Sequence, residues 1–314
     1  MTRKRPKAAN ELDLFLDSGA FSAWTQKKEI GIEEYIQFIK ENESRFTVYA
    51  NMDVIALGKS TKDRAEAARR TLENQKTMER AGLAPLPVFH MGEPLEYLDF
   101  YVKNYPYIAM GGLVGAPRSS LITWLDHCFR NFICGANGLP KIKVHGFGIT
   151  AHALLLLFPW YSVDSTSWVM VSRMGGILVP SYKKGNWVYD DMGLKVTVSS
   201  RSPKINQEAQ HISTLSPRQR DCVLNYLHEK GYKLGSSRFE RVSPTRVLES
   251  NERWAEKKQK DPQALRLMEI IEEEGVSNKY QLRDEVNIIY YQDLEKALPE
   301  WPWEYKSSNI GFNL

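Results

Sequence analysis

Residues 86–112 read LPVFHMGEPLEYLDFYVKNYPYIAMGG, and this stretch decides the predicted fold class. Leu86–Phe89 is a short apolar run that ends at a polar residue and a glycine, as a buried strand does. Leu95–Val102 has the spacing of a helix, and Tyr107–Met110 is a second apolar run that ends at two glycines. The order strand, helix, strand indicates a parallel β-α-β unit.

The same alternation extends through the first 170 residues of the chain. Further strands are predicted at Leu12–Leu16, Phe46–Ile55, Ile142–Val144 and Tyr161–Val163. Further helices are predicted at Ile32–Asn42, Thr61–Ala81, Ser119–Ile133 and Ala151–Phe158. No first turn carries Gly-x-Gly-x-x-Gly, which disfavours a dinucleotide-binding sheet. We therefore predict an α/β fold of the (β/α)8 TIM-like barrel type.

The stretch after residue 170 is less regular, and we expect the last strands of the barrel to be irregular too. Candidate strands are Gly176–Val179, Asn186–Asp190 and Leu194–Ser199, with Lys183-Lys184-Gly185 as a hairpin turn between the first two. Residues 1–204 form the predicted barrel core, and residues 205–314 form a helical region that partly completes it. Its predicted helices run from Ser216-Pro217 to Gly231, near Ala264–Glu274, and over Tyr280–Ala297.

Composition narrows the class of protein. The chain has 314 residues, 42% hydrophobic and 25% charged, which is typical of a globular protein and not of a disordered one. The longest apolar stretch, Ala153–Trp160, is too short to cross a bilayer, and no apolar segment of a secretory signal follows the basic residues 1–10. Three cysteines without a Cys-x-x-Cys pair predict neither a disulfide framework nor a structural metal site. We predict a soluble, reduced protein of the cytoplasm.

Charge divides the C-terminal region into a basic part, 205–260, and an acidic part, 261–314. Residues 201–260 hold 13 Lys and Arg against 7 Asp and Glu, whereas residues 261–314 hold 5 against 11. The basic part predicts contacts with nucleic-acid phosphates, and the alternative is a solvated surface. The candidate residues are Arg218, Arg220, Lys230, Lys233, Arg238, Arg241 and Arg246. Trp301-Pro302-Trp303 is interpreted either as a packing anchor or as a platform for bases.

Polar residues and glycines follow the predicted strands. They are Asp17-Ser18-Gly19, Asp53, His90, Gly111-Gly112, His145-Gly146 and Asp164-Ser165. Each alone is explained by a tight turn or a helix cap. Together they predict an active site at the edge where parallel strands end. Asp17 and Asp164 stand out, because paired carboxylates suit glycosyl chemistry.

Five motifs between residues 12 and 190 resemble motifs of the tRNA-guanine transglycosylase superfamily, and they follow one another along the chain in the same order as in that family. Residues 17–21 (DSGAF) resemble its Asp-Ser-Gly-Gly-Phe motif, and residues 111–115 (GGLVG) its Gly-Gly-Leu-Ala-Val-Gly segment. Residues 163–165 (VDS) stand where its nucleophilic aspartate should be, and residues 144–148 (VHGFG) resemble the strand end before it. Residues 172–176 (SRMGG) are similar to the Thr-Arg segment that leads into a hairpin.

The resemblance implies roles for individual residues. Asp164 would be the nucleophile at C1′ of a guanosine-type nucleotide, and Asp17 the general acid and base. Asp53 would accept the N–H edge of the base, Phe21 would stack on it, and Arg173 would meet a phosphate. Backbone groups at Gly112 and Leu113 would bind the base. The implied substrate-binding residues are Ser18, Gly19, Phe21, Asp53, His90, Gly111, Gly112, Leu113, Gly146 and Arg173.

Departures from the family pattern refine this reading. The zinc site of the tRNA enzymes is missing, since residues 215–231 hold only Cys222 and His228 as possible ligands. Ala20 and Ser22 replace a glycine and a glutamine, and no further RNA-binding domain is visible. The chain therefore resembles the compact DpdA branch, which puts 7-deazaguanines into DNA.

The resemblance predicts a pentosyltransferase that exchanges guanine in DNA for a free 7-deazaguanine such as preQ0. It needs no cofactor or metal, and no membrane. An accessory protein could open the DNA, because the chain has no P-loop of its own. The alternatives are the same exchange on tRNA, a glycosylase that removes a base, and a non-catalytic nucleic-acid-binding barrel.

Overall fold

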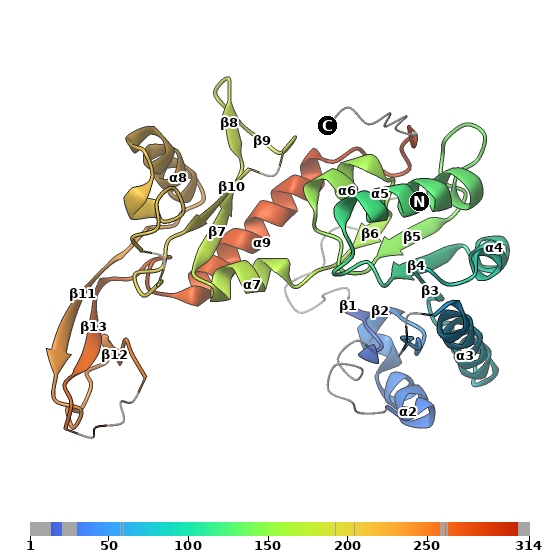
Figure 1. The fold of residues 1–314 in the computed structure, drawn as a ribbon, viewed down its shortest axis with the longest axis horizontal. Coiled ribbons are helices and arrows are strands. Elements are labelled where there is room, and N and C mark those ends of the chain that lie inside the picture. Colours follow the sequence, from blue (N-terminus) through green and yellow to red (C-terminus); the bar gives the residue numbers. More distant parts are fainter. Residues whose placement is uncertain are drawn as a thin grey trace. The chain divides into compact units, whose positions relative to one another are not determined.

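The computed structural model describes residues 14–20, 30–56, 58, 60–191, 193–203, 205–257, 261 and 263–306. Helices and small sheets together make a mixed α/β fold (Figure 1). The chain forms two compact units. The first unit contains Met1–Ser165 and Glu300–Leu314, and the second contains Thr166–Pro299.

The first unit contains a run of parallel strands. They are β1 (Leu14–Leu16), β2 (Phe46–Tyr49), β3 (Val88–His90), β4 (Tyr107–Gly111), β5 (Lys143–Gly146) and β6 (Ser162–Val163). β1 pairs with β2, and β3 to β6 pair in chain order. A parallel bridge between Ala50 and Leu86 links the two groups. The predicted parallel α/β arrangement is thus present in this unit, although no pairing among the described residues closes it into a barrel.

Helices alternate with these strands. They are α2 (Ile32–Asn42), α3 (Thr61–Arg80), α4 (Leu95–Asn104), α5 (Arg118–Cys128) and α6 (His152–Leu157), with a π-helical turn, η2 (Phe129–Ile133), after α5. The bounds of α2 agree with the prediction, and α3 ends one residue earlier than predicted. α3 begins at a capping box in which Ser60 and Asp63 each bond the other's backbone N–H.

Apolar side chains bury both faces of the parallel strands. One cluster, centred on Ala50, Val88 and Ala109, lies within the strands themselves. A second cluster joins α2 to β2 through Ile39, Tyr49 and neighbouring residues. Burial on both faces leaves the strand ends as the place where polar side chains remain accessible.

Residues 300–306 belong to the first unit and pack on it. The ring of Trp301 meets Tyr161 edge-on at 5.1 Å, and its Nε1–H donates to the carbonyl of Pro159 at 3.2 Å. The Tyr305 ring stacks on Phe158 with centroids 5.6 Å apart. These contacts favour the interpretation of the tryptophan segment as a packing anchor.

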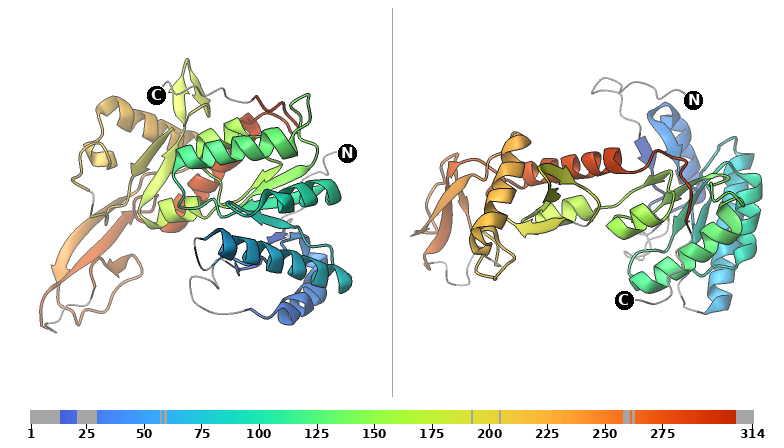
Figure 2. Two further views of the ribbon diagram at one scale, coloured as in Figure 1. Left: turned by 45° about the vertical axis from the view of Figure 1, so that its right-hand side comes forward. Right: turned by 90° about the horizontal axis from the view of Figure 1, so that it is seen from above.

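The second unit is built around α9 (Tyr280–Ala297). α9 runs alongside α7 (Ser167–Arg173) and contacts β7 (Gly176–Val179), as the views in Figures 1 and 2 agree. Asn287 of α9 fixes this packing, because its Oδ1 accepts the N–H of Leu178 at 2.8 Å. These contacts explain why the unit begins at Thr166 and not after the predicted boundary at residue 204.

Strands after residue 170 pair in an antiparallel way. β7 pairs with β10 (Leu194–Thr197), and β8 (Ser181–Lys183) pairs with β9 (Asn186–Val188). The predicted turn at Lys183-Lys184-Gly185 is therefore present, and β9 follows it where a strand was predicted, but the strand before it is β8 and not β7. The reason is that β7 finds its partner further along the chain, in β10.

The C-terminal region is not all helical, which corrects the prediction for residues 205–314. Helix α8 (Pro217–Glu229) begins at the Ser216 cap as predicted. The predicted helix near Ala264–Glu274 is wrong, because Arg266–Glu273 is strand β13. It pairs with β11 (Ser236–Val242) on one side and β12 (Glu252–Trp254) on the other.

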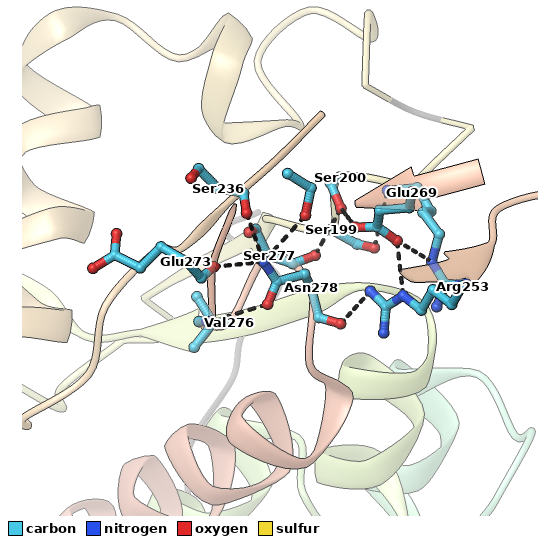
Figure 3. Close-up of polar contacts among 12 residues, drawn as sticks. Ser199, Ser200, Ser236, Arg253, Glu269, Glu273, Val276, Ser277 and Asn278 are labelled. Atoms are coloured by element: carbon cyan, nitrogen blue, oxygen red, sulfur yellow. Dashed lines mark hydrogen bonds and ion pairs between the residues drawn. The ribbon is translucent and has the colours of Figure 1, made fainter. Parts of the chain in front are cut away.

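Asn278 joins the end of this sheet to α9. Its side-chain amide donates to the carbonyls of Ser236 at 3.1 Å and Glu273 at 2.8 Å (Figure 3).

Among the helices of the described ranges, none is both long enough and apolar enough to cross a membrane.

Candidate active site

Three of the predicted site residues follow the carboxyl ends of parallel strands in the first unit. Asp17 follows β1, Asp53 follows β2, and Asp164 follows β6. Asp17 is close enough to the other two that both of their charges raise its pKa. The structure thus brings together carboxylates that lie up to 147 positions apart in the sequence.

Asp53 and His90 form the buried part of this site. Nε2 of His90, the last residue of β3, lies 2.8 Å from Oδ2 of Asp53, and Nδ1 lies 3.0 Å from Oε1 of Glu93. Burial lowers the pKa of His90, but the bonds and charges of the two carboxylates outweigh it and raise the pKa to about 10. His90 is therefore an imidazolium that donates to both carboxylates at neutral pH.

Ser18 completes the shell around Asp53. Its Oγ–H donates to Oδ1 of Asp53 at 2.5 Å, and the Ser18 side chain is buried. Burial raises the pKa of Asp53, yet the bonds from His90 and Ser18 and the His90 charge lower it overall. Asp53 is consequently ionised and fixed in orientation, and each of its oxygens retains a lone pair for another donor.

Asp164 is an ionised and accessible carboxylate. Its side chain is 53% exposed. Its Oδ1 accepts the backbone N–H of Gly148 at 2.9 Å and lies 3.5 Å from Nε2 of His145. Burial raises the pKa of Asp164, but His145 and the Gly148 N–H lower it below its usual range. The group is therefore an anion that a substrate can reach.

Asp17 has the opposite tendency. Loss of hydration is the largest cause that raises its pKa, followed by the charges of Asp53 and then Asp164. The backbone N–H groups of Gly19 and Ser18 oppose this increase without cancelling it. Asp17 therefore keeps its proton to a higher pH than Asp164 does. Two nearby carboxylates with pKa values moved apart are the usual arrangement of an acid and a nucleophile.

A chain of hydrogen bonds reaches Nδ1 of His145, the ring nitrogen that does not face Asp164. The Tyr107 hydroxyl lies 2.6 Å from Ser162 Oγ, which lies 2.7 Å from Nδ1 of His145. The Ser162 hydroxyl, which can both donate and accept, therefore links the phenol of Tyr107 to the imidazole of His145. Nε2 of the same imidazole faces Asp164, whose pKa is lowered by the hydrogen bond and the charge of His145. Phe15 stacks on the imidazole at 4.4 Å and holds its plane.

Glu93, Ser162 and Tyr107 were not among the predicted site residues, and His145 was predicted only as one of the polar residues that follow strands. Only His145 had a local signal, its position beside Gly146 at the end of a predicted strand. Glu93 is 6% exposed, a rare degree of burial for a glutamate, and its partner His90 is three residues away. The roles of Ser162 and Tyr107 depend on pairing between strands that sequence spacing does not show.

The predicted glycines lie where strands end. Gly111 has no room for a side chain, since a Cβ would lie 2.8 Å from Cδ2 of His90. Gly112 has a φ of +69°, and Gly146 is packed against Ile149 and Trp160. Leu113 is buried and lines a hollow of about 280 Å3. That hollow is also lined by Val114, Gly115, Ala116, Arg118, Leu121, Gly148, Ile149, Thr150, Ala151 and Leu154.

Phe21 lies outside the described residues. Arg173 belongs to the second unit, where its guanidinium lies 4.8 Å from the ring centre of Tyr280. Gly19, with a φ of +74°, makes the turn that follows Asp17. The substrate roles of all three stay predictions.

Most of the predicted basic residues carry an acidic partner. The ion pairs are Lys230–Asp293, Lys233–Glu273, Arg238 with Glu240 and Glu272, Arg241–Glu256, and Arg246–Glu252. Arg218 and Arg220 are exposed on α8 and form no ion pair with a described residue. Local neutralisation therefore reduces the positive surface that the sequence predicts.

Metal ligands are not grouped in the described ranges, which contain no set of three or more His, Cys, Asp or Glu placed to hold an ion.

Comparison with protein-family models, curated proteins and solved structures found no match to this chain. The class of protein that the site supports is therefore argued from its own geometry and from the sequence motifs.

Proposed function

We propose that this chain is a pentosyltransferase that exchanges guanine in DNA for a free 7-deazaguanine of the preQ0 type. The observation that carries the proposal is the pair Asp17 and Asp164, whose pKa values move in opposite directions at one edge of the strands. An ionised carboxylate beside one with a raised pKa suits a double displacement at a sugar carbon.

In the first step, a carboxylate oxygen of Asp164 attacks C1′ of the target deoxyguanosine. The bond between C1′ and N9 breaks, and its electron pair goes to the guanine. Asp17 gives its proton to the departing base, which leaves as neutral guanine. The sugar is then held as an ester of Asp164, and Asp17 is a carboxylate.

In the second step, Asp17 takes the N9 proton of the incoming 7-deazaguanine. N9 attacks C1′, the bond from C1′ to Asp164 breaks, and the Asp164 carboxylate is regenerated. Two displacements at C1′ retain its configuration, and the ester conserves the energy of the glycosidic bond that was broken. The exchange needs no redox partner or energy source.

Asp53 is suited to hold the base during both steps. A guanine-type edge presents N–H donors, and Asp53 offers fixed carboxylate oxygens already oriented by Ser18 and His90. Backbone groups of Gly112 and Leu113, which follow β4, would bind the same base. A rigid acceptor that is already charged costs little reorganisation when the substrate binds.

The proposed fold of the catalytic core is a (β/α)8 TIM-like barrel with irregular last strands. The six parallel strands β1 to β6 follow one another in chain order, as in such a barrel. The remaining strands would come from the antiparallel pairs after residue 170.

DNA is the proposed nucleic acid because residues 215–231 lack the set of zinc ligands that the tRNA enzymes carry. A base in a duplex must leave the stack before C1′ can be reached. We therefore include an accessory protein that opens the duplex, and we place the reaction in the cytoplasm of a bacterial cell.

The test mixes purified protein and labelled preQ0 with duplex DNA, single-stranded DNA or tRNA in separate reactions. Wild type, Asp164→Asn and the surface control Arg80→Gln are compared. Label in DNA with wild type and the control, but not with Asp164→Asn, is the expected result. Label in tRNA alone overturns the choice of substrate. Base release without label, or no reaction on any nucleic acid, overturns the exchange.

A further inference from the structure

The second unit contains a hollow that the proposed reaction does not use. It has a volume of about 310 Å3 and lies between the chain after β10 and the sheet of β11, β12 and β13. Its lining residues are Ser200, Arg201, Ser202, Ile205, Phe239, Ala255 and Leu267. One side of the hollow is therefore polar and cationic, and the other side is apolar.

A fully buried carboxylate contacts Arg201, the cationic residue that lines the hollow. Glu269 of β13 has no exposed surface, and its Oε1 accepts the Ser200 hydroxyl at 2.8 Å. Its Oε2 accepts Nε–H of Arg253 at 2.8 Å and lies 3.2 Å from Nε of Arg201. Figure 3 shows the contacts of Glu269 with Ser200 and Arg253. One carboxylate thus serves two guanidiniums, which leaves an excess of positive charge.

A third guanidinium adds to this excess. Arg283 is buried and donates to the carbonyls of Ser172 at 2.9 Å and Val276 at 2.6 Å. Burial and the charges of Arg201 and Arg253 lower its pKa to about 10, although Asp284 and Glu269 act in the opposite direction. Burial and repulsion from Arg253 also lower the pKa of Arg201, against the attraction of Glu269. Cations that repel one another in a partly desolvated place are stabilised by an added anion.

Arg201 is placed to receive that anion. Glu269 orients the guanidinium through Nε, the side chain is 39% exposed, and its Nη atoms have no acceptor among the described residues. A guanidinium fixed through Nε presents two parallel N–H donors, which match two oxygens of a phosphate.

The apolar side of the hollow indicates what accompanies the phosphate. Phe239 of β11 is 36% exposed and Ile205 is 37% exposed, and Leu267 lies between β11 and β12 on the middle strand of the sheet. Contact with an aromatic ring would not stabilise a bound inorganic phosphate ion. Such contact does stabilise a nucleotide, because its flat base packs on an aromatic ring while its phosphate binds a cation.

We propose that this hollow binds one nucleotide of a nucleic-acid strand, with a phosphodiester on Arg201 and a base against Phe239. The inference depends on the proposed function for the strand, since a base-exchange enzyme must hold nucleic acid beyond the target nucleotide. It assigns Arg201 and Phe239, which lie outside the basic residues predicted from the sequence, to substrate binding.

The test measures the affinity of a fluorescent single-stranded DNA by anisotropy at several salt concentrations. Wild type is compared with Arg201→Gln, Phe239→Ala and Arg80→Gln, the last being an exposed arginine of α3 in the first unit. Loss of one charged contact predicts roughly tenfold weaker binding for Arg201→Gln and a salt slope smaller by about one. Phe239→Ala is expected to weaken binding without changing the slope.

Equal affinities of Arg201→Gln and Arg80→Gln overturn the inference. If Arg201→Gln unfolds, as thermal denaturation would show, Arg201→Lys replaces it, because lysine keeps the charge but loses the two parallel donors. Binding that depends on Arg201 in a protein without exchange activity overturns the proposed reaction and leaves this site standing. Normal exchange with binding indifferent to Arg201 overturns the site and leaves the reaction standing.

Discussion

Nε2 of His145 lies 3.5 Å from Oδ1 of Asp164, and hydrogen bonds from Tyr107 through Ser162 reach Nδ1 of the same imidazole. The Asp164 side chain is 53% exposed, whereas the histidine side chain that lowers its pKa is 2% exposed. Such a buried donor holds the nucleophile in one orientation and favours its ionised form. We class His145 as a positioning residue.

Replacing His145 is expected to move the pH dependence of exchange. Because His145 lowers the pKa of Asp164, His145→Phe raises that pKa, and activity on the acid side is lost at higher pH than in wild type. The expected displacement is about one pH unit, the effect of one charged hydrogen bond. The measurement is the pH profile of kcat/KM. His145→Gln keeps a hydrogen-bond donor and should recover part of this displacement. Identical pH profiles for His145→Phe and wild type would exclude His145 as a positioning residue for Asp164.

His90 should make the stability of the first unit depend on pH. Its pKa rises from 6.5 to about 10 on folding, so its contribution is complete below pH 6.5 and is lost as the pH rises through 10. Urea unfolding of wild type is therefore expected to need less denaturant at pH 10 than at pH 6.5. In His90→Gln this part of the dependence disappears, and the free energy of unfolding at neutral pH falls by about 3 kcal/mol, because Asp53 and Glu93 lose their shared cation. A pH dependence that persists unchanged in the variant contradicts this account.

Gly148 combines a conformational and a steric requirement beside Asp164. Its φ is +71°, and an added Cβ would lie 2.5 Å from Cγ2 of Val114. Gly148→Ala is expected to lower the free energy of unfolding by about 2 kcal/mol and to slow exchange, since its N–H binds Asp164. Gly82, with a φ of +86° and open space around it, is the matched control. Gly82→Ala should cost only about 1 kcal/mol and leave exchange unchanged; equal losses of exchange in both variants would rule out a local effect at Asp164.

Trp301 distinguishes packing from nucleic-acid binding at the C-terminal segment. Trp301→Ala removes the edge contact with Tyr161 and the bond to Pro159, and about 3 kcal/mol of unfolding free energy should be lost. Urea unfolding measures this change, and DNA anisotropy on the same sample should show no change in affinity. Weaker DNA binding without a loss of stability would favour the alternative, in which the tryptophan stacks on bases.

Helices with clear ends were predictable from the sequence. α2 and α9 have the predicted bounds, and α8 begins at the predicted cap, because caps and apolar spacing are local properties that read directly from neighbouring residues. The convergence of Asp17, Asp53 and Asp164 followed from a rule of parallel sheets, in which strand ends share one edge.

Residues 266–273 show where local reading fails. Leu, Met, Ile and Glu in this segment favour a helix, yet the segment is the middle strand of a sheet. Its pairing partners, β11 and β12, supply hydrogen bonds on both sides, and Met268 and Glu269 become fully buried there. Contacts made across the chain thus override propensity. The partners of His90 and His145 escaped prediction for a related reason, since they depend on side-chain geometry between strands.

The return of residues 300–306 to the first unit has a consequence for synthesis. A nascent chain that has emerged as far as Pro299 contains all the strands and helices that the structure describes in the first unit, but Tyr305 has not yet been added to cover Phe158. The unit that is translated first is therefore completed last, and the second unit can finish folding before it. A chain that ends before Tyr305 lacks the ring that stacks on Phe158.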